Sequence, residues 1–289
     1  MGIDRRMLGP VSPEVGPSHG APLEPGGRVR WAAHTAIDCQ DAAAWRALPA
    51  AGGRAAVGVV ADGAGVGPEL RPGCEHPVDW FSTRLVDAVL ARLAPADALG
   101  PVVGEPPTLA DAVAGALECV RGAHPGCDAD TGPWATLAVA RAVGDRLEYF
   151  VLCDSSLVVR FTDGQVLQVI DGRLDALVGG WAGTGPSPAS VMNTPGGWWS
   201  ARADVRAADE GLTGSFALEE VEAAWLATDG ATRPIEMFRT LDAPAWAEAV
   251  ARDPWALAHG IRAHETEHAE RLRAGGHKVH DDIAILRVV

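Results

Sequence analysis

The chain has 289 residues, of which 47% are hydrophobic and 21% are charged. This length and composition suit one large domain, or two small ones, with a well-buried core. The 38 acidic side chains outnumber the 24 basic ones, so the formal net charge is −14 at pH 7. Such a chain is not expected to bind nucleic acid or an anionic membrane by charge alone, because both need clustered positive charge.

Cysteine usage and hydropathy narrow the class of protein further. The five cysteines are scattered and none forms a C-x-x-C pair, which argues against a disulfide framework and against a thiolate zinc site. No apolar run approaches the roughly 18 residues that span a bilayer. The opening MGIDRRMLGP lacks the apolar stretch of a signal peptide. We therefore expect a cytoplasmic protein.

The first part of the chain predicts a tail followed by alternating strands and helices. Residues 1–27 are rich in Pro and Gly and show no hydrophobic period, which predicts a loop or tail, and one domain is expected over 28–289. The pattern then predicts strands at 29–36 and 54–61 and helices at 78–93 and 108–121. Thr108 is expected to cap the second helix, with Asp111 in the place of the capping-box acid.

The rest of the chain is richer in strands, which are separated by Gly-Asp, Cys-Asp-Ser and Asp-Gly turns. Strands are predicted at 134–143, 147–152, 157–161, 166–170, 223–228 and 283–288. Helices are predicted within 234–251 and 254–274, and 191–209 is expected to be a loop with room for one strand. Together these elements predict an α+β fold in a single domain.

Acidic residues mark the ends of several predicted strands. The segments AVGVVADG, EYFVLCDS and AAWLATDG end near Asp62, Asp154 and Asp229, and the pair Asp281–Asp282 precedes the last strand. If these strands are neighbours, their ends gather the hard oxygen ligands that Mg²⁺ and Mn²⁺ prefer. Asp-Gly is also a common turn signal, so each aspartate taken singly also fits a turn.

Five motifs, in order, resemble those of the PPM-type, or type 2C, metal-dependent protein serine/threonine phosphatases, particularly divergent bacterial members. That family shows an E/N/Q-D-A segment, a D-G-x-G block, a G-D-S block, an S/T-D-G block and a terminal D-N/D strand. The matching blocks are CQDA (39–42), VVADGAG (59–65), LCDSSLVVRFTDG (152–164), LATDG (226–230) and HDDIAIL (280–286). The resemblance covers about 28–289.

The resemblance implies two packed antiparallel β-sheets flanked by helices, with two Mg²⁺ or Mn²⁺ ions at one end. In it, Asp62 bridges both ions, the Gly63 carbonyl contacts one of them, and Asp154 matches the position of a third ion. The full set of implied metal ligands is Asp41, Asp62, Gly63, Asp154, Asp229 and Asp281. Both Asp281 and Asp282 open the last strand, and the family register favours Asp281.

The implied activity is hydrolysis of a phosphomonoester by a hydroxide held between the two ions. The expected partner is a phosphorylated protein carrying phosphoserine or phosphothreonine. The implied catalytic residues are Asp62, Asp229 and His34. His34 enters as a substitute, because Ala36 stands where the family often has a phosphate-binding arginine.

Two further departures from the family pattern keep alternatives open. Ala64 replaces a histidine that is common in eukaryotic relatives, and Cys153 replaces the glycine of G-D-S. One alternative is an inactive phosphatase-like domain that binds a partner through the same cleft. Another is a phosphatase for a small phosphorylated metabolite, because substrate choice would depend on loops such as 65–77 and 179–197.

Other signals are interpreted structurally. Residues 264–268 fit the zinc-binding pattern H-E-x-x-H, but no downstream ligand follows at metzincin spacing, so we expect a charged, solvated helix. Thr136 is expected to be a core residue of its strand, and His277 and His280 are expected to be polar loop residues. Most tryptophans are expected in the core, with Trp198 and Trp199 as the exceptions that could line a groove.

Overall fold

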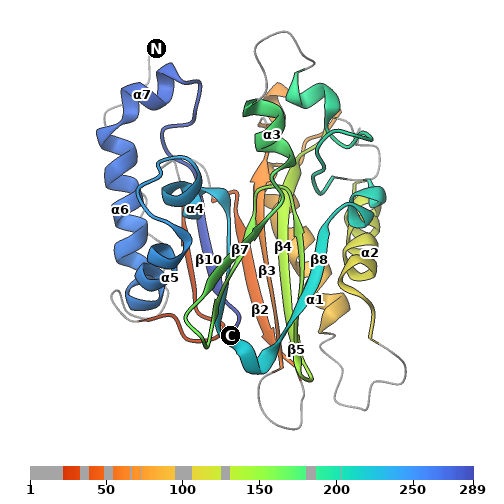
Figure 1. The fold of residues 1–289 in the computed structure, drawn as a ribbon. Helices are drawn as coiled ribbons and strands as arrows, with labels where there is room; N and C mark the ends of the chain where they lie inside the picture. The colour runs from red at the N-terminus through yellow and green to blue at the C-terminus, as the bar shows by residue number, and fades with distance from the viewer. Residues whose placement is uncertain are drawn as a thin grey trace.

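Two antiparallel sheets packed face to face form the centre of the protein, and helices cover both outer faces (Figure 1). The computed structural model describes residues 22–32, 39–48, 55–65, 67–71, 73–94, 106–124, 131–179, 187–202 and 204–289. The helices in these ranges include none with the length and apolar character to cross a membrane. The arrangement is the four-layer α-β-β-α sandwich expected from the resemblance.

Each sheet has five strands, and the strand pairs are antiparallel. In order across the first sheet, the strands are β1 (Arg28–Trp31), β10 (Ile283–Arg287), β9 (Val221–Ala227), β6 (Ser156–Phe161) and β7 (Val166–Ile170). Across the second sheet they are β2 (Ala42–Ala47), β3 (Ala56–Ala64), β4 (Trp134–Val143), β5 (Arg146–Leu152) and β8 (Leu212–Ala217).

Side chains that alternate along the central strands separate the core into layers. On β9, Leu226 packs between the two sheets, whereas Trp225 faces the outer helices. On β3, Val60 packs between the sheets and Val59 faces the helices on the other side. Because successive side chains of a strand point to opposite faces, a strand buried on both faces reads as a continuous apolar run.

Two helices cover the second sheet and three cover the first. Helices α1 (Val78–Leu93) and α2 (Leu109–Gly122) pack on β3, β4 and β5, and α4 (Asp229–Glu236), α5 (Ala243–Arg252) and α6 (Pro254–Glu267) pack on the first sheet. The remaining helices are α3 (Arg173–Gly179), α7 (Ala269–Ala274) and the 3₁₀ turns Pro68–Leu70, Pro188–Val191, Val205–Asp209 and Leu218–Glu220.

Many predicted elements are confirmed. The helix at 78–93 and the strands at 134–143 and 166–170 have the predicted bounds. The hydroxyl of Thr108 accepts a hydrogen bond from the Asp111 amide at 3.1 Å and donates to the Asp111 carboxylate at 2.6 Å, which confirms the cap.

Other elements differ from the sequence pattern. The pattern predicts no β2, β8 or α3; β2 reads AAAWRA and lacks the β-branched residues that mark strands. Helix α4 begins at Asp229, directly after β9, and contains Pro234, where the pattern predicts a later start. The strand predicted at 29–36 begins at Arg28, and its second half lies outside the described residues.

The expectation for Trp198 and Trp199 is wrong, because each is only 3% exposed. Trp199 packs in the cluster formed by α1, α2 and the second sheet. The ring of Trp198 lies edge-on to that of Trp134, with centroids 5.3 Å apart. Burial of an indole ring removes a large apolar area from water, which is favourable. Burial of these two rings therefore stabilises the packing of an irregular segment, made of 3₁₀ turns and isolated bridges, against the sheet.

The contact between the sheets gives a first test. Leu226 is fully buried between them, so Leu226→Ala should lower the free energy of unfolding by about 2–5 kcal/mol through lost transfer energy and a residual cavity. The matched control Leu212→Ala removes a leucine that is 41% exposed on edge strand β8, and it should cost far less. Chemical denaturation of both variants measures the difference, and equal losses would contradict this packing.

Candidate metal centre

The carboxylates converge because antiparallel pairing places the relevant strand ends at one edge of each sheet. In the second sheet, Ala42 of β2 pairs with Ala61 of β3, so Asp41 lies beside Asp62. In the first sheet, the end of β9 pairs with the beginnings of β6 and β10. Asp229 follows the end of β9, Asp154 precedes β6, and Asp281 precedes β10.

The five aspartates lie near enough to one another to influence one another's ionisation, although among the described residues no three of their carboxylates have oxygens within 4.8 Å of one another. Burial raises the pKa of Asp62 well above its ordinary value, and the charges of Asp229, Asp41, Asp281 and Asp154 raise it further. Burial likewise raises the pKa of Asp229 well above its ordinary value, with Asp281 and Asp154 as the next causes. Without a cation, carboxylates this close oppose one another's ionisation.

The pKa values of Asp41 and Asp154 are raised by the same two causes, burial and neighbouring negative charge. Burial, then the charge of Asp282, raises the pKa of Asp41 to about 7. Burial also raises the pKa of Asp154 to about 6, and the charges of Asp175 and Asp281 add to the rise. These side chains hold protons more tightly than ordinary aspartates, so a divalent cation in the cluster would displace protons.

Unused oxygen atoms make this cluster suitable for a metal. The Thr228 hydroxyl donates to Asp41 Oδ2 at 2.7 Å, while the buried Asp41 Oδ1 accepts no hydrogen bond from an N–H or O–H group of the described residues. Asp154 Oδ1 is also buried without such a donor. Buried carboxylate oxygens usually have hydrogen-bond partners, and a hard divalent cation would satisfy these two.

Close backbone contacts hold the segments of the site together. A Cβ atom on Gly63 would lie 2.4 Å from the Gln40 carbonyl oxygen, and one on Gly230 would lie 1.9 Å from the Asp282 carbonyl oxygen. Asp282 Oδ2 accepts a hydrogen bond from the Gln40 amide at 2.7 Å. Glycine is therefore required at both positions by contact with the neighbouring backbone.

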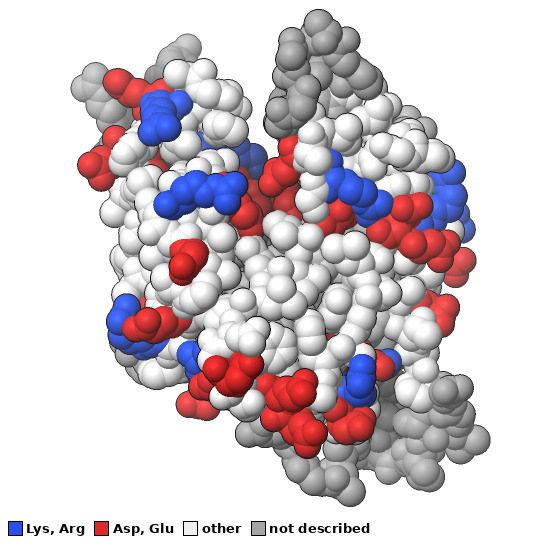
Figure 2. Space-filling model, viewed as in Figure 1, with Lys and Arg blue, Asp and Glu red and all other residues white. Residues whose placement is uncertain are grey.

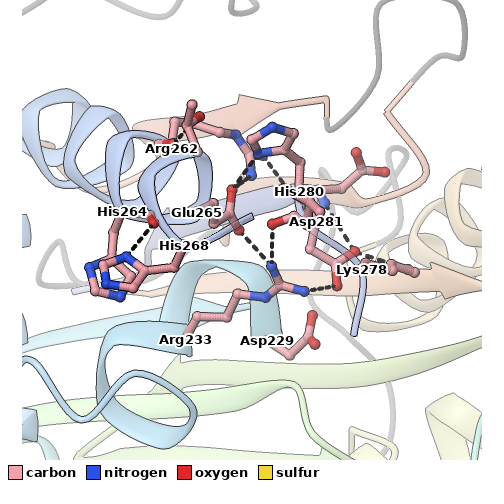
Figure 3. A network of polar contacts seen from close by, with 12 residues as sticks. Asp229, Arg233, Arg262, His264, Glu265, His268, Lys278, His280 and Asp281 are labelled. Carbon is pink, nitrogen blue, oxygen red and sulfur yellow. Dashed lines mark hydrogen bonds and ion pairs between the residues drawn. The ribbon is translucent and has the colours of Figure 1, made fainter. Parts of the chain in front are cut away.

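Asp281 joins the acidic cluster to a network of ion pairs (Figure 3). Its Oδ2 accepts from Arg233 Nη2 and its Oδ1 accepts from Lys278 Nζ, both at 2.9 Å. Arg233 Nη1 also donates to Glu265 Oε1 at 2.6 Å, and Glu265 is fully buried. Arg262 Nη1 and His280 Nδ1 reach Glu265 Oε2 at 2.6 and 3.0 Å.

This network changes the interpretation of the H-E-x-x-H segment. Glu265, the glutamate at the second position of this pattern, points into the protein instead of into solvent, because Arg233 and Arg262 offer it charge-assisted hydrogen bonds. The rings of His264 and His268 stack with centroids 4.1 Å apart, and α6 ends at Glu267. The expectation of a wholly solvated helix is therefore wrong at Glu265.

The structure brings together most of the site residues expected from sequence. Asp41, Asp62, Asp154, Asp229 and Asp281 lie in the electrostatic cluster described above. Gly63 follows Asp62 at the end of β3. His34 lies outside the described residues.

The comparison with known families decides what kind of protein carries this site. The family model for protein phosphatase 2C matches residues 31–253. The chain belongs to the protein phosphatase 2C family. No curated protein sequence matches this phosphatase 2C-family chain at a significant level.

Solved structures agree on the fold at low sequence identity. The serine/threonine phosphatase Stp1 from Staphylococcus aureus is 11% identical, with 99% of this chain and 98% of that chain covered and a TM-score of 0.54. The Mycobacterium tuberculosis phosphatase PstP/Ppp is 18% identical, with 90% and 95% covered and a TM-score of 0.50.

Cys153 stands where the family motif has glycine, and it adopts a backbone conformation that favours glycine. Cys153 has φ = 63°, in the left-handed region that favours glycine, which the family's G-D-S motif has at this position. Its amide donates to Asp171 Oδ2 at 3.2 Å, and the side chain is buried. The turn that carries Asp154 therefore keeps its left-handed conformation with a cysteine in place of glycine, at a conformational cost on the order of 1 kcal/mol.

Several residues of the site were not expected from sequence. Thr228, Arg233 and Lys278 contact the aspartates directly, and Thr136 donates to or accepts from Ser155 at 2.5 Å beside Asp154. Thr136 is 1% exposed in β4, which confirms its expected place in the core. Thr228 could have been expected at the site from the sequence, because it stands directly before Asp229.

The site opens to solvent at the end of the sandwich. Acidic side chains gather on the floor of a hollow at the upper end of the molecule, between the side that carries α4 and α7 and the side that carries α3 (Figure 2). Asp62, Asp154 and Asp229 are half-buried, whereas Asp41 is 1% exposed.

The raised pKa values predict how stability depends on pH. In the metal-free folded protein, Asp41 and Asp154 hold protons up to about pH 7 and pH 6, whereas the unfolded chain releases them near about pH 4. The stability that these groups contribute is therefore fully present below about pH 4 and is lost as pH rises from about 4 to about 7. In chelator, the Tm of the wild type should fall between pH 5.5 and pH 8.

Asp62→Asn removes one charge from the cluster, so its Tm should fall less over the same pH range. Asp163→Asn, in an exposed turn, is the matched control and should follow the wild type. Differential scanning calorimetry in chelator measures all three proteins. Parallel curves for the wild type and Asp62→Asn would show that the aspartates do not repel one another as described.

Lys278 supplies a cation to the cluster from within the chain. Although burial lowers its pKa, the Asp281 and Asp62 carboxylates outweigh that effect and raise the pKa above its ordinary value. Its side chain is 59% exposed, so removal should not disturb the core. Lys278→Met should tighten Mn²⁺ binding by up to about fivefold, the scale of an exposed ion pair. Electron paramagnetic resonance of free Mn²⁺ measures the Kd, and weaker binding would contradict this competition.

Proposed function

We propose that the protein is a Mn²⁺- or Mg²⁺-dependent phosphatase that hydrolyses phosphoserine or phosphothreonine in a protein substrate. The observation that carries the proposal is the cluster of five aspartates, two of which have buried oxygens without a donor, in a chain of the protein phosphatase 2C family. Divalent ions bound there would neutralise the charge on phosphate oxygens and acidify a water molecule at neutral pH.

The residues proposed to hold the ions are Asp41, Asp62, the Gly63 carbonyl, Asp154, Asp229 and Asp281. The charges of all four of the other aspartates raise the pKa of Asp62. Thr228 keeps Asp41 in place through Oδ2, and the buried Oδ1 accepts no hydrogen bond from the described residues. Arg233 holds Asp281 from the side of the helices.

The side chains at the site also limit which proton transfers can occur. No histidine follows Asp62-Gly63, because Ala64 stands there, and the leaving alkoxide must therefore take its proton from another source. Solvent in the hollow is available for that step. We therefore expect turnover to depend on the basicity of the leaving group, with para-nitrophenyl phosphate hydrolysed faster than a phosphothreonine peptide.

The first experiment is release of phosphate from para-nitrophenyl phosphate and from a phosphothreonine peptide, with Mn²⁺, with Mg²⁺ and with chelator. Asp62→Asn should lower the metal-dependent rate about 100-fold or more, since the ions contribute several kcal/mol of transition-state stabilisation. Asp163→Asn, which changes an exposed aspartate in a turn, should retain the wild-type rate. If Asp62→Asn keeps the wild-type rate, the proposed metal site is wrong.

A specific observation supports one alternative, a phosphatase-like domain that binds a phosphorylated partner without hydrolysis. Both carboxylate oxygens of Asp281 are engaged by Arg233 and Lys278, which compete with a metal for this ligand. On this alternative, the folded wild type releases no phosphate under any metal condition and still binds the phosphopeptide. Calorimetric titration of the same peptide separates the two functions.

A further inference from the structure

Three side chains outside the acidic cluster form a second group of metal-binding type. Cys74 and His76 lie in the segment that leads into α1, and His124 follows the C-terminal end of α2. Their ligand atoms all lie within 4.8 Å of one another. Cys74 is 3% exposed and His124 is 6% exposed, whereas His76 is half-buried.

The distances within this group are those of a zinc site. Cys74 Sγ lies 3.6 Å from His124 Nε2 and 3.9 Å from His76 Nδ1. Zinc bonds of about 2.3 Å to sulfur and 2.0–2.1 Å to nitrogen, at tetrahedral angles, place sulfur and nitrogen about 3.6 Å apart. Binding would therefore require only small movements of these atoms.

The two imidazole rings are also held in their orientations. The ring of Trp80 stacks on that of His124, with centroids 4.8 Å apart and planes inclined by 24°. It contacts the ring of His76 as well, with centroids 4.2 Å apart. Arg71 donates a hydrogen bond to the His76 carbonyl, which fixes the backbone of this segment. A binding site that is rigid before the metal arrives loses less entropy when it binds.

The donor set selects a different metal from the aspartate cluster. A thiolate and two imidazoles suit Zn²⁺, whereas Mg²⁺ and Mn²⁺ prefer carboxylate and water oxygens. Among the described residues, the Cys74 group is the one set of three such donors that converges in this way. Cys127 stands three positions after His124 in the sequence and lies outside the described residues, so the site is built without it.

The position of this group relates it to the aspartate cluster. Helix α1 begins at Val78, and Val78 Cγ1 would lie 2.8 Å from a Cβ on Gly63, the residue after Asp62. One turn later, the Ser82 hydroxyl donates to the Gln40 carbonyl at 2.5 Å. The start of α1 therefore packs against the backbone beside both Asp62 and Asp41, and a metal that fixes residues 74–76 would fix this contact.

We propose that Cys74, His76 and His124 bind one Zn²⁺ ion, with a water molecule as the fourth ligand, and that this ion ties the start of α1 to the end of α2. The competing explanation is that the same contacts are hydrogen bonds between the thiol and the imidazoles, with no metal. The two differ in metal content, in the ionisation of Cys74 and in the effect of chelators.

The experiment measures metal in the full-length protein after dialysis against a weak chelator. Mass spectrometry of metals should find about one zinc per chain. After exchange with Co²⁺, the wild type should show a thiolate-to-cobalt charge-transfer band in the near ultraviolet and intense visible bands of tetrahedral cobalt. Cys74→Ser should lose the charge-transfer band, and His76→Gln should lose most of the bound metal.

Three matched variants serve as controls. Cys119→Ser changes an exposed cysteine on α2, His259→Gln changes a histidine of α6, and both should keep one zinc. Asp62→Asn should also keep it, which separates this site from the aspartate cluster. A folded wild type without zinc and without a cobalt charge-transfer band would overturn the proposal, and so would an unchanged band in Cys74→Ser. The wild-type measurement decides the question even if a variant does not fold.

Discussion

Repulsion between carboxylates at one end of the sandwich is the constraint on which the rest of the site depends. Antiparallel pairing brings Asp41 beside Asp62 in one sheet and the segments of Asp154 and Asp229 together in the other, and the face-to-face packing of the two sheets brings these pairs to one end. The free energy of bringing like charges together must be offset by protons, by cationic side chains or by bound cations.

The chain offsets part of that charge through its helices. Arg233 of α4 contacts both Asp281 and the fully buried Glu265, so it connects the sheet edge to α6. Glu265 is in turn surrounded by Arg262 and His280. A buried charge pair contributes little net stability, but loss of one member would leave the other uncompensated. This network fixes where the helices sit relative to Asp281.

Local patterns in the sequence predicted the central strands, because apolar runs are a local signal. The choice of the aspartates as one set, and the packing of two sheets face to face, came from the resemblance to the type 2C phosphatases, because each Asp-Gly taken singly also fits a turn. Contacts between distant residues had no such signal: Cys74 and His124 stand fifty positions apart, and the bond from Arg233 to Asp281 spans nearly as many. Trp199 was also misjudged, since its burial depends on packing against α1 and α2.

The ion pair of Lys278 has a practical consequence, because Lys278 is the chain's single lysine. Its ε-amine is thus chemically unique apart from the α-amine, whose pKa is lower by more than about 2 units. An amine-reactive fluorophore has this one side chain to attach to beside Asp281, but near neutral pH it reacts faster with the α-amine, because the raised pKa of Lys278 keeps the ε-amine protonated; labelling of Lys278 needs a higher pH. Because acylation removes the positive charge, the attachment itself would change the electrostatic balance of the cluster, and the same label would report it. The protein therefore carries a built-in attachment point for spectroscopy at the rim of its acidic hollow.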